Sequence, residues 1–596
     1  MLELKTYQRK KMLVMLCVMF AVAMFLIGRL FYIMIGRGDY YSQQAEQLHE
    51  RERAIKAPRG IIYDRNGVVL AGNRSVCTIS VIHSQVTDPE QVIEILSEKL
   101  SISEETIRKK VEKVSSREKI ASNVDIEIAD QIRTYHLDGV MIDDDYKRYY
   151  PYNEMASKVL GFTGADNQGI VGLEVKYDSV LQGQDGYILT LTDAHGIEIN
   201  NTAEHRLEPV AGNNLHTSID ANIQQYVEQE AEKALIAKEA IGVSIIVMNP
   251  NNGEIYAMVN APEYNLNDPY TLNIDINDTP QADEVEATET EAMSKQDALN
   301  QMWRNFCVND TYEPGSIFKT VTATAALEND VVTVNDTFVC PGFRKIGNWT
   351  IKCHKVSGHG AETFREGIMN SCNPVFMDVG LRVGADRMYQ TYEQLNLTGK
   401  TGIDLPGEAG SILHPKEDVQ EVDLAVMSFG QSLQFTPIQI ISAVSTIVNG
   451  GNRITPHFGM YVTDSEGNRV ETYEYPVEAS VISEETSATM RELLEAVVME
   501  GGGSKGQVEG YRMAGKTATS EKLPRGNGKY IASYIGMAPA DNPQVITLVL
   551  INEPTGVYYG GTIAAPVAKR IYENILPYLG INPTYEVSEP ENNEAQ

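Results

Sequence analysis

Cysteine is scarce and irregularly placed in this sequence, which limits how the fold can be held together. Only six of the 596 residues are cysteine, and no spacing between them repeats. They are Cys17, Cys77, Cys307, Cys340, Cys353 and Cys372. A chain of this length and apolar content can build a large hydrophobic core. A small scaffold stapled by disulfides is therefore excluded.

Two of the cysteines still invite a local prediction. Cys340 and Cys353 flank a short turn-rich segment, so a disulfide between them would close a short loop. His354 and His359 follow closely, which raises the alternative of a zinc site. Their spacing fits no standard set of zinc ligands. We therefore expect no metal ion and keep the disulfide as a prediction.

Basic side chains are also few. The chain has 50 lysines and arginines against 81 acidic residues, and its net charge is −31. Residues 1–37 carry a net charge of +5, which leaves −36 for the rest. Such a surface repels a phosphate backbone, so the sequence predicts no nucleic-acid partner.

The N-terminal region carries a long apolar segment. Residues 12–28 contain no charge, and a second apolar run, residues 30–35, follows Arg29. The span 12–35 is long enough to cross a bilayer as one helix, and basic residues before it predict a cytoplasmic N-terminus at 1–11 and an extracytoplasmic remainder. A cleaved signal peptide ending near Ala21-Val22-Ala23 is the alternative. Apolar residues continue beyond that point, which favours an uncleaved anchor.

Beyond the anchor the patterns alternate between helix and strand, so we expect an α+β protein. Residues 36–213 predict an elongated mixed α+β pedestal that begins with a polar helical stalk over 38–56. Residues 214–580 predict a second domain with an acidic insertion at about 275–291, and residues 581–596 form an acidic tail. The clearest expected helices are 88–100, 103–114, 126–136, 221–238 and 564–576, and the clearest strands are 243–248, 254–259, 530–537 and 545–552. A mainly helical block is expected from residue 316 to about 450.

The segment Tyr312 to Lys319 carries the first chemical signal. Pro314 and Gly315 break the preceding structure, and an apolar stripe then predicts a helix that begins at Ser316. Lys319 lies three residues on, nearly one helical turn, so its amine can reach the Ser316 hydroxyl. That arrangement is typical of an activated nucleophile. A capping serine followed by a solvated lysine is the ordinary alternative.

Two further segments must be weighed with this pair. One loop holds Ser371 and Asn373, and a probable strand holds Lys516, Thr517 and Thr519. Each segment alone is weak evidence for a catalytic site, because a serine can cap a helix, an asparagine can occupy a turn, and a lysine can be exposed to solvent.

The segment 510–517 also matches the G-x-x-x-x-G-K-T phosphate loop letter for letter. A phosphate loop needs an apolar strand before it and a helix after it. Here a polar, glycine-rich stretch precedes the match, and Pro524 and two glycines follow, so we do not predict a nucleotide site.

In the order Ser316-x-x-Lys319, Ser371-x-Asn373 and Lys516-Thr517, the three segments resemble the active-site motifs of penicillin-binding proteins and serine β-lactamases. Further stretches resemble class B penicillin-binding proteins in particular. They are Arg59-Gly60 to Gly67, Gly169 to Glu174, Asn252-Gly253-Glu254, Tyr312 to Ser316 and Thr436-Pro437-Ile438-Gln439. No stretch resembles a glycosyltransferase domain. The resemblance is therefore to the monofunctional transpeptidase form.

This resemblance implies a transpeptidase domain with an antiparallel sheet flanked by helices, as in serine β-lactamases. It implies that Ser316 attacks the D-Ala-D-Ala carbonyl of a peptidoglycan stem peptide, with Lys319, Ser371, Asn373 and Lys516 as catalytic residues. Thr517 and Thr519 would bind substrate. The backbone N–H groups of Ser316 and Thr519 would form the oxyanion hole, and no cofactor is needed.

One position departs from the family pattern, because Ala518 stands where glycine is usual. In the family, the glycine lets substrate lie against the strand, and Ala518 adds a methyl group there.

The resemblance also implies β-lactams as ligands, a bacterial membrane location and a membrane partner such as a glycan-polymerising protein, and it leaves a homodimer open. A carboxypeptidase or β-lactamase is one alternative function, although the sequence offers no convincing base to activate water. A non-catalytic scaffold or β-lactam sensor is the other.

Overall fold

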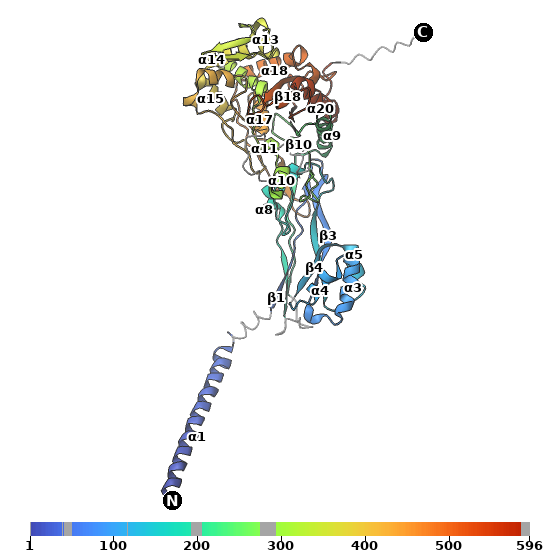
Figure 1. Ribbon diagram of the computed structural model, residues 1–596, viewed down its shortest axis with the longest axis vertical. Coiled ribbons are helices and arrows are strands. Elements are labelled where there is room, and N and C mark those ends of the chain that lie inside the picture. Colours follow the sequence, from blue (N-terminus) through green and yellow to red (C-terminus); the bar gives the residue numbers. More distant parts are fainter. Residues whose placement is uncertain are drawn as a thin grey trace, which may run out of the picture. The chain divides into compact units, whose positions relative to one another are not determined.

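The computed structural model describes residues 2–38, 40, 50–115, 117–191, 205–273 and 294–585 (Figure 1). The predicted insertion at 275–291 and the tail from 586 onward lie outside these residues. The chain forms two compact units that interleave in sequence. Unit 1 comprises Met1–Pro58, Arg74–Lys147 and Gly183–Ala211, and unit 2 comprises Arg59–Asn73, Arg148–Gln182 and Gly212–Gln596.

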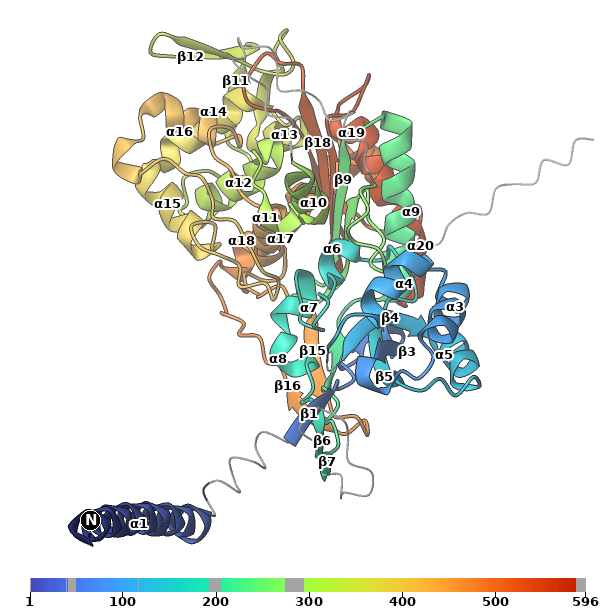
Figure 2. The same cartoon turned by 60° about the horizontal axis from the view of Figure 1, so that its bottom comes forward.

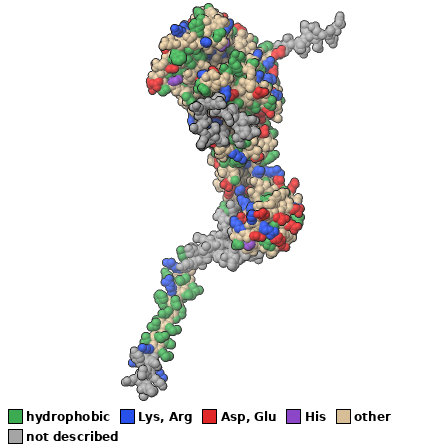
Figure 3. Space-filling view, viewed as in Figure 1, with side chains coloured by type: hydrophobic (Ala, Val, Ile, Leu, Met, Phe, Trp, Pro, Cys, Tyr) green, Lys and Arg blue, Asp and Glu red, His purple; other side chains and the backbone are tan. Residues whose placement is uncertain are grey.

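The N-terminal helix is the one described helix that is long and apolar enough to cross a membrane, over Arg9–Gly36. It consists of α1 (Leu2–Phe31) and a π-helical turn, η1 (Tyr32–Gly36). Hydrophobic side chains cover its exposed surface (Figure 3). Such a surface is stable in contact with lipid.

In the described part of unit 1, three α-helices pack with strands around one apolar cluster, and a separate three-stranded sheet contributes no residue to that cluster. These helices and strands are β1 (Glu50–Ile55), α3 (Pro89–Leu100), α4 (Glu104–Val111), β4 (Glu118–Asp125), α5 (Ile126–Arg133), β5 (Val140–Tyr149), β6 (Gly186–Leu191) and β7 (His205–Leu207). The long strand β3 (Val69–Val81) runs into this unit and pairs with β4 and β5. Ile79, Ile93 and Ile107 are among the buried side chains of the cluster.

The helical stalk predicted over 38–56 is wrong for its C-terminal part. Residues 50–55 form β1, which pairs antiparallel with β6 over six residues. Pairing with a strand more than 130 residues away overrides the local preference of this charged segment.

Unit 2 is built on a five-stranded antiparallel sheet in the order β10-β9-β19-β18-β17. The strands are β9 (Gly242–Met248), β10 (Ile255–Ala261), β17 (Ala514–Glu521), β18 (Tyr530–Ala538) and β19 (Val545–Asn552). Alternate residues of β9 face two different clusters: Val243 and Ile245 join one, and Ile246 and Met248 join the other. The sheet is therefore covered on both faces.

Helices α9 (Ala221–Lys238) and α20 (Ala565–Tyr578) cover one face, and the larger helical layer covers the other (Figure 2). The larger layer contains α10 (Lys295–Trp303), α11 (Phe306–Asn309), α12 (Lys319–Glu328), α13 (Phe364–Met369), α14 (Asn373–Val383), α15 (Ala385–Gln394), α16 (Glu421–Met427), α17 (Pro437–Val448) and α18 (Glu484–Met499). Asp220 caps α9 by accepting from Ile223 N–H, and Thr436 forms a capping box at α17.

Four short strands interrupt the block that was predicted to be mainly helical. They are β11 (Thr337–Cys340), β12 (Phe343–Ile346), β13 (Trp349–Lys352) and β14 (Gly360–Thr363). β12 and β13 form a hairpin, and β11 pairs with β14. Runs of four residues are too short to show a strand periodicity in the sequence.

Unit 2 also contains several short strands and helices. They are β2 (Ile62–Tyr63), α6 (Ser157–Leu160), α7 (Gly172–Lys176), α8 (Asp178–Leu181), β8 (Asn214–Thr217), β15 (Gly459–Thr463), β16 (Arg469–Thr472) and α19 (Gly560–Ile563). Strands β16, β15, β8, β2 and β3 lie side by side in that order. A turn joins β2 to β3, and Gly67 in it has a φ of +85°.

A buried ion cluster ties these segments together. Glu174 accepts from Arg59 Nε and Arg148 Nε, each at 2.6 Å, and from Tyr150 Oη at 3.2 Å. Arg59 also reaches Asp178 at 2.7 Å, and the side chains of Arg59, Arg148 and Glu174 are almost fully buried. Two of the segments that carry the family resemblance, at Arg59 and Glu174, therefore meet here.

We predict that Glu174→Gln lowers the free energy of unfolding by about 3–5 kcal/mol, because it leaves the buried Arg148 without a counter-charge and leaves Arg59 with Asp178 alone. Urea denaturation of the detergent-solubilised chain measures this loss. The control is Glu573→Gln, which removes an exposed partner 3.7 Å from Lys569 and should cost less than about 1 kcal/mol. Equal shifts in the two variants would contradict the prediction.

Candidate active site

Strand β17 places Lys516 inside the domain. It is the edge strand of the sheet, paired only with β18 among the described strands. Alternation along the strand buries Lys516, Ala518 and Ser520, while Thr517 and Thr519 stay half-buried. Since Lys516 is inside a strand and no helix follows it directly, the match to a phosphate loop has the wrong structure for nucleotide binding.

Ser316 lies in a 3-10 turn, η4 (Gly315–Phe318), that continues into α12. Gly315 has a φ of +53°, and a Cβ there would lie 2.4 Å from Ser520 Oγ of β17. Its N–H donates to Gly430 O at 3.0 Å. The absence of a side chain at Gly315 thus lets the turn approach the edge of the sheet.

Helix α12 is buried on nearly all sides rather than along one stripe. Of its ten residues, the first eight are buried. Its threonine hydroxyls are satisfied internally or by neighbouring loops: Thr324 Oγ1 donates to Thr320 O, and Thr322 Oγ1 donates to Ser428 O, both at 2.8 Å. The helix therefore holds Lys319 away from solvent.

The loop between α13 and α14 supplies Ser371 and Asn373. Ser371 has a φ of +53°, a left-handed conformation that is uncommon for serine. Asn373 is the first residue of α14, and Pro374 follows in the first turn. Its Nδ2 donates to Lys352 O at 3.3 Å, so the β12-β13 hairpin contacts this loop.

Two lysine amines meet at the Ser371 side chain. Lys319 Nζ donates to Ser371 Oγ at 3.1 Å, to Ser371 O at 2.6 Å and to Asn373 Oδ1 at 2.7 Å. Lys516 Nζ donates to Ser371 Oγ at 3.0 Å and to Thr517 O at 3.0 Å. All three motifs that the sequence singled out are therefore brought together, although they lie far apart in the chain.

The predicted contact between Lys319 and Ser316 is not formed as a hydrogen bond in the described chain. Helical spacing puts the two residues one turn apart, but the amine is directed at Ser371 and Asn373 instead. Ser371 and Asn373 compete with Ser316 for the Lys319 amine. The residues around Lys319 in the sequence do not indicate this competition.

Burial perturbs both amines. It lowers the pKa of Lys319 from its ordinary value to about 8, against the opposing effect of Cys372, Cys353 and Glu362 nearby. Burial and then the charge of Lys319 lower the pKa of Lys516 well below its ordinary value. Two like charges in a region of low dielectric repel, so the pair releases a proton more readily than exposed lysines do.

Ser316, Ser371, Asn373, Thr517 and Thr519 all line one cavity of about 690 Å³. Sequence reasoning missed several other residues of its wall. They are His354, His359, Glu500, Tyr558, Tyr559 and Gly560. The two consecutive glycines Gly560-Gly561 are a sequence signal for a close approach of the backbone to another segment. A Cβ at Gly560 would lie 2.2 Å from Ala518 O, so the absence of a side chain there lets the start of α19 pack directly on β17.

Ala518 takes the position where a glycine was expected. The residue is 4% exposed and belongs to the apolar cluster beside the turn of Gly315, although it also lines the cavity. The methyl group is therefore largely covered by protein.

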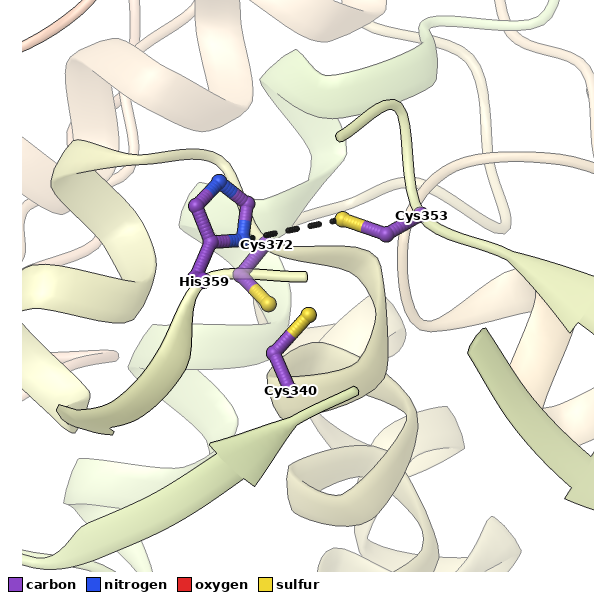
Figure 4. A group of neighbouring side chains, drawn as sticks. All are labelled: Cys340, Cys353, His359 and Cys372. Carbon is purple, nitrogen blue, oxygen red and sulfur yellow. Dashed lines mark hydrogen bonds between the residues drawn. The ribbon is translucent and has the colours of Figure 1, made fainter. Parts of the chain in front are cut away.

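The disulfide predicted between Cys340 and Cys353 is wrong, because both are free thiols. They lie instead beside His359 and Cys372 (Figure 4). The expectation that no ligand set exists overlooked Cys372, which is distant in sequence and lies inside the Ser371-Cys372-Asn373 motif. Only the folded loop reveals that it joins the other two.

Comparison with known proteins shows the family. Residues 243–573 match the model of the penicillin-binding protein transpeptidase domain, and residues 54–217 match the penicillin-binding protein dimerisation domain. The chain belongs to the penicillin-binding protein transpeptidase family.

Among named relatives, stage V sporulation protein D of Bacillus subtilis is 36% identical, over 96% of this chain and 86% of its own length. The peptidoglycan D,D-transpeptidase FtsI of Escherichia coli K12 is 29% identical, over 95% and 91%.

Solved structures share the fold. Penicillin-binding protein 2X of Streptococcus thermophilus has a TM-score of 0.72 at 22% identity, covering 89% of this chain and 81% of that one. Penicillin-binding protein 3 of the tubercle mycobacterium, in complex with aztreonam, has a TM-score of 0.66 at 24% identity, covering 89% and 98%.

Proposed function

We propose that the chain is a membrane-anchored D,D-transpeptidase that cross-links peptidoglycan stem peptides through an acyl-enzyme at Ser316. The observation that carries this proposal is the meeting of the Lys319 and Lys516 amines at Ser371, in the wall of the cavity that Ser316 lines. The E. coli relative that is named a peptidoglycan D,D-transpeptidase supports the assignment.

The first half-reaction needs a neutral amine near the nucleophile. Lys319, with its lowered pKa, accepts the Ser316 proton as Oγ attacks the carbonyl carbon of the penultimate D-Ala. The amide C–N bond then breaks, and the terminal D-Ala leaves with a proton relayed by Ser371. In the second half-reaction an amine attacks the ester, and Ser316 recovers its proton.

Lys516 binds the substrate carboxylate as its charged partner. An arriving carboxylate raises the pKa of a nearby ammonium, so the proton that the lysine pair retains is stabilised on Lys516. Thr517 and Thr519 line the same wall and supply hydroxyl groups to that carboxylate. Asn373 holds the amide groups of the stem peptide.

Backbone N–H groups of Ser316 and Thr519 form the proposed oxyanion hole. Ser316 lies at the start of a helical segment and Thr519 on an edge strand, two settings in which some N–H groups lack internal partners. One such donor typically contributes about 3–4 kcal/mol to transition-state stabilisation.

The helix Arg9–Gly36 is the proposed anchor, with the N-terminus in the cytoplasm and the catalytic unit outside. A membrane partner that polymerises glycan, and self-association through the segment matched to the dimerisation domain, are part of the same proposal. The complex of the mycobacterial protein with aztreonam supports β-lactams as inhibitors of this chain.

We predict that the full chain in detergent joins a stem peptide ending in D-Ala-D-Ala to an added amine. The cross-linked amide should increase with amine concentration, because the amine competes with water for the acyl-enzyme. Mass spectrometry of the products measures the ratio of amide to free acid. Free acid alone at every amine concentration would indicate a hydrolase instead.

We predict that penicillin acylates Ser316. Ser316→Ala should give no adduct, Lys319→Ala should slow acylation by about 10²–10⁴-fold, and Lys516→Ala by about 10–100-fold. Peptide mass spectrometry locates the adduct, and stopped reactions give the rates. The control Ser465→Ala, at an exposed turn, should react like the unaltered chain. An adduct that persists in Ser316→Ala would refute the assignment.

We also predict how acylation depends on pH. With a pKa of about 8 for Lys319, about a tenth of the amine is neutral at pH 7. The acylation rate should rise through neutral pH and level off above about pH 8. Rates measured from pH 6 to 9, with exposed Lys400→Ala as control, test this. A rise that continues unchanged through pH 9 would indicate an unperturbed lysine.

A further inference from the structure

Four side chains with soft or borderline donor atoms meet beside the Ser371 loop. Cys340 ends β11, Cys353 follows β13, His359 precedes β14, and Cys372 caps α14. Their ligand atoms all lie within 4.8 Å of one another and point toward a common centre (Figure 4). None of these residues was assigned a function above.

The spacing suits a tetrahedral ion. With Zn–S bonds of ~2.3 Å and Zn–N bonds of ~2.0 Å, two ligand atoms of a tetrahedron lie ~3.5–3.8 Å apart. Cys353 Sγ and His359 Nδ1 are 3.8 Å apart. Three cysteines and one histidine form a common structural zinc set, and small side-chain movements would close the remaining distances.

Burial makes a bound cation a better explanation than chance contact. Cys340, Cys353 and Cys372 are at most 2% exposed. The carboxylate of Glu362 is also buried, 3.7 Å from His359 Nδ1, and its Oε1 has no hydrogen-bond partner in the described chain. An unpaired buried carboxylate oxygen is costly, so the polar groups of this cluster are not satisfied by the protein alone.

We propose that Cys340, Cys353, His359 and Cys372 bind one Zn²⁺ ion, which positions the loop of Ser371 and Asn373. Binding would release the three thiol protons and leave Glu362 beside the occupied site. With four protein ligands the coordination would be closed, so the ion would be structural and would not contact substrate.

The link to the active site runs through neighbouring residues. Cys372 lies between Ser371 and Asn373, which accept hydrogen bonds from Lys319 at 2.6–3.1 Å. Asn373 donates to Lys352, the residue before Cys353. The ion would therefore connect both sides of this contact, and it would hold Ser371 in its left-handed conformation. This positioning role, unlike the binding of metal, depends on the function proposed above.

Metal content of the full chain, purified in detergent with a reductant, tests the site directly. We expect about one Zn²⁺ per chain by elemental mass spectrometry, and Co²⁺ replacing it should give the visible absorption of a tetrahedral thiolate site. Cys340→Ala and His359→Ala should each weaken Zn²⁺ binding at least tenfold. Cys307→Ala, a buried cysteine outside the cluster, is the matched control and should keep its metal.

Two results would overturn the site. One is metal content that is no higher in the unaltered chain than in Cys340→Ala. The other is a disulfide between two of the cluster cysteines in freshly isolated protein, found by peptide mapping without reduction. Neither measurement is an assay of activity. A failure of the metal site can therefore be distinguished from a failure of the proposed transpeptidase function.

The positioning role is tested by removing Zn²⁺ with a chelator and adding it back. We expect penicillin acylation to slow at least tenfold and to recover with Zn²⁺, while Cys307→Ala responds in the same way as the unaltered chain. Glu362→Gln, which keeps all four ligands, should retain one Zn²⁺. Unchanged acylation after complete loss of metal would refute the positioning role and leave the site itself standing.

Discussion

The active site depends on two buried amines that share one hydroxyl. Lys319 and Lys516 both donate to Ser371 Oγ, at 3.1 and 3.0 Å, in a region with little access to water. Two full positive charges there would repel each other and would lack solvation, so the arrangement favours the loss of one proton. A neutral amine close to a serine and a charged amine close to a substrate carboxylate are the two states that the proposed chemistry needs.

The fold of unit 2 brings Lys319 and Lys516 together and buries them. Lys319 is buried because α12 is enclosed by other helices, and Lys516 is buried because it faces inward from an edge strand. The turn of Ser316 can approach the strand only because Gly315 has no side chain. The loop of Ser371 completes the contact in a conformation that costs free energy, which the surrounding hydrogen bonds offset.

The cysteine cluster borders the same loop, because Cys372 is one of its members. Cys372 lies between Ser371 and Asn373 in the chain. Of the other three members, Cys340 ends β11, and Cys353 and His359 lie next to the ends of β13 and β14. These strands have four residues each, and several of those residues are exposed, so their own packing offers little stability. A bound ion would supply the missing constraint at the position where the geometry of the site is set.

Sequence patterns within single segments were sufficient to predict many of the helices and strands and the candidate site residues. The apolar run of α1, the ends of α9, and the strands β9 and β19 follow from periodicity, and the three motifs identified the candidate site residues. Tertiary structure alone decided that residues 50–55 form a strand, that Lys319 contacts Ser371 and Asn373 rather than Ser316, and that Cys372 joins Cys340, Cys353 and His359. The physical reason is common to all three. Each depends on a partner far away in the chain, whose position is set by packing and not by the residues on either side.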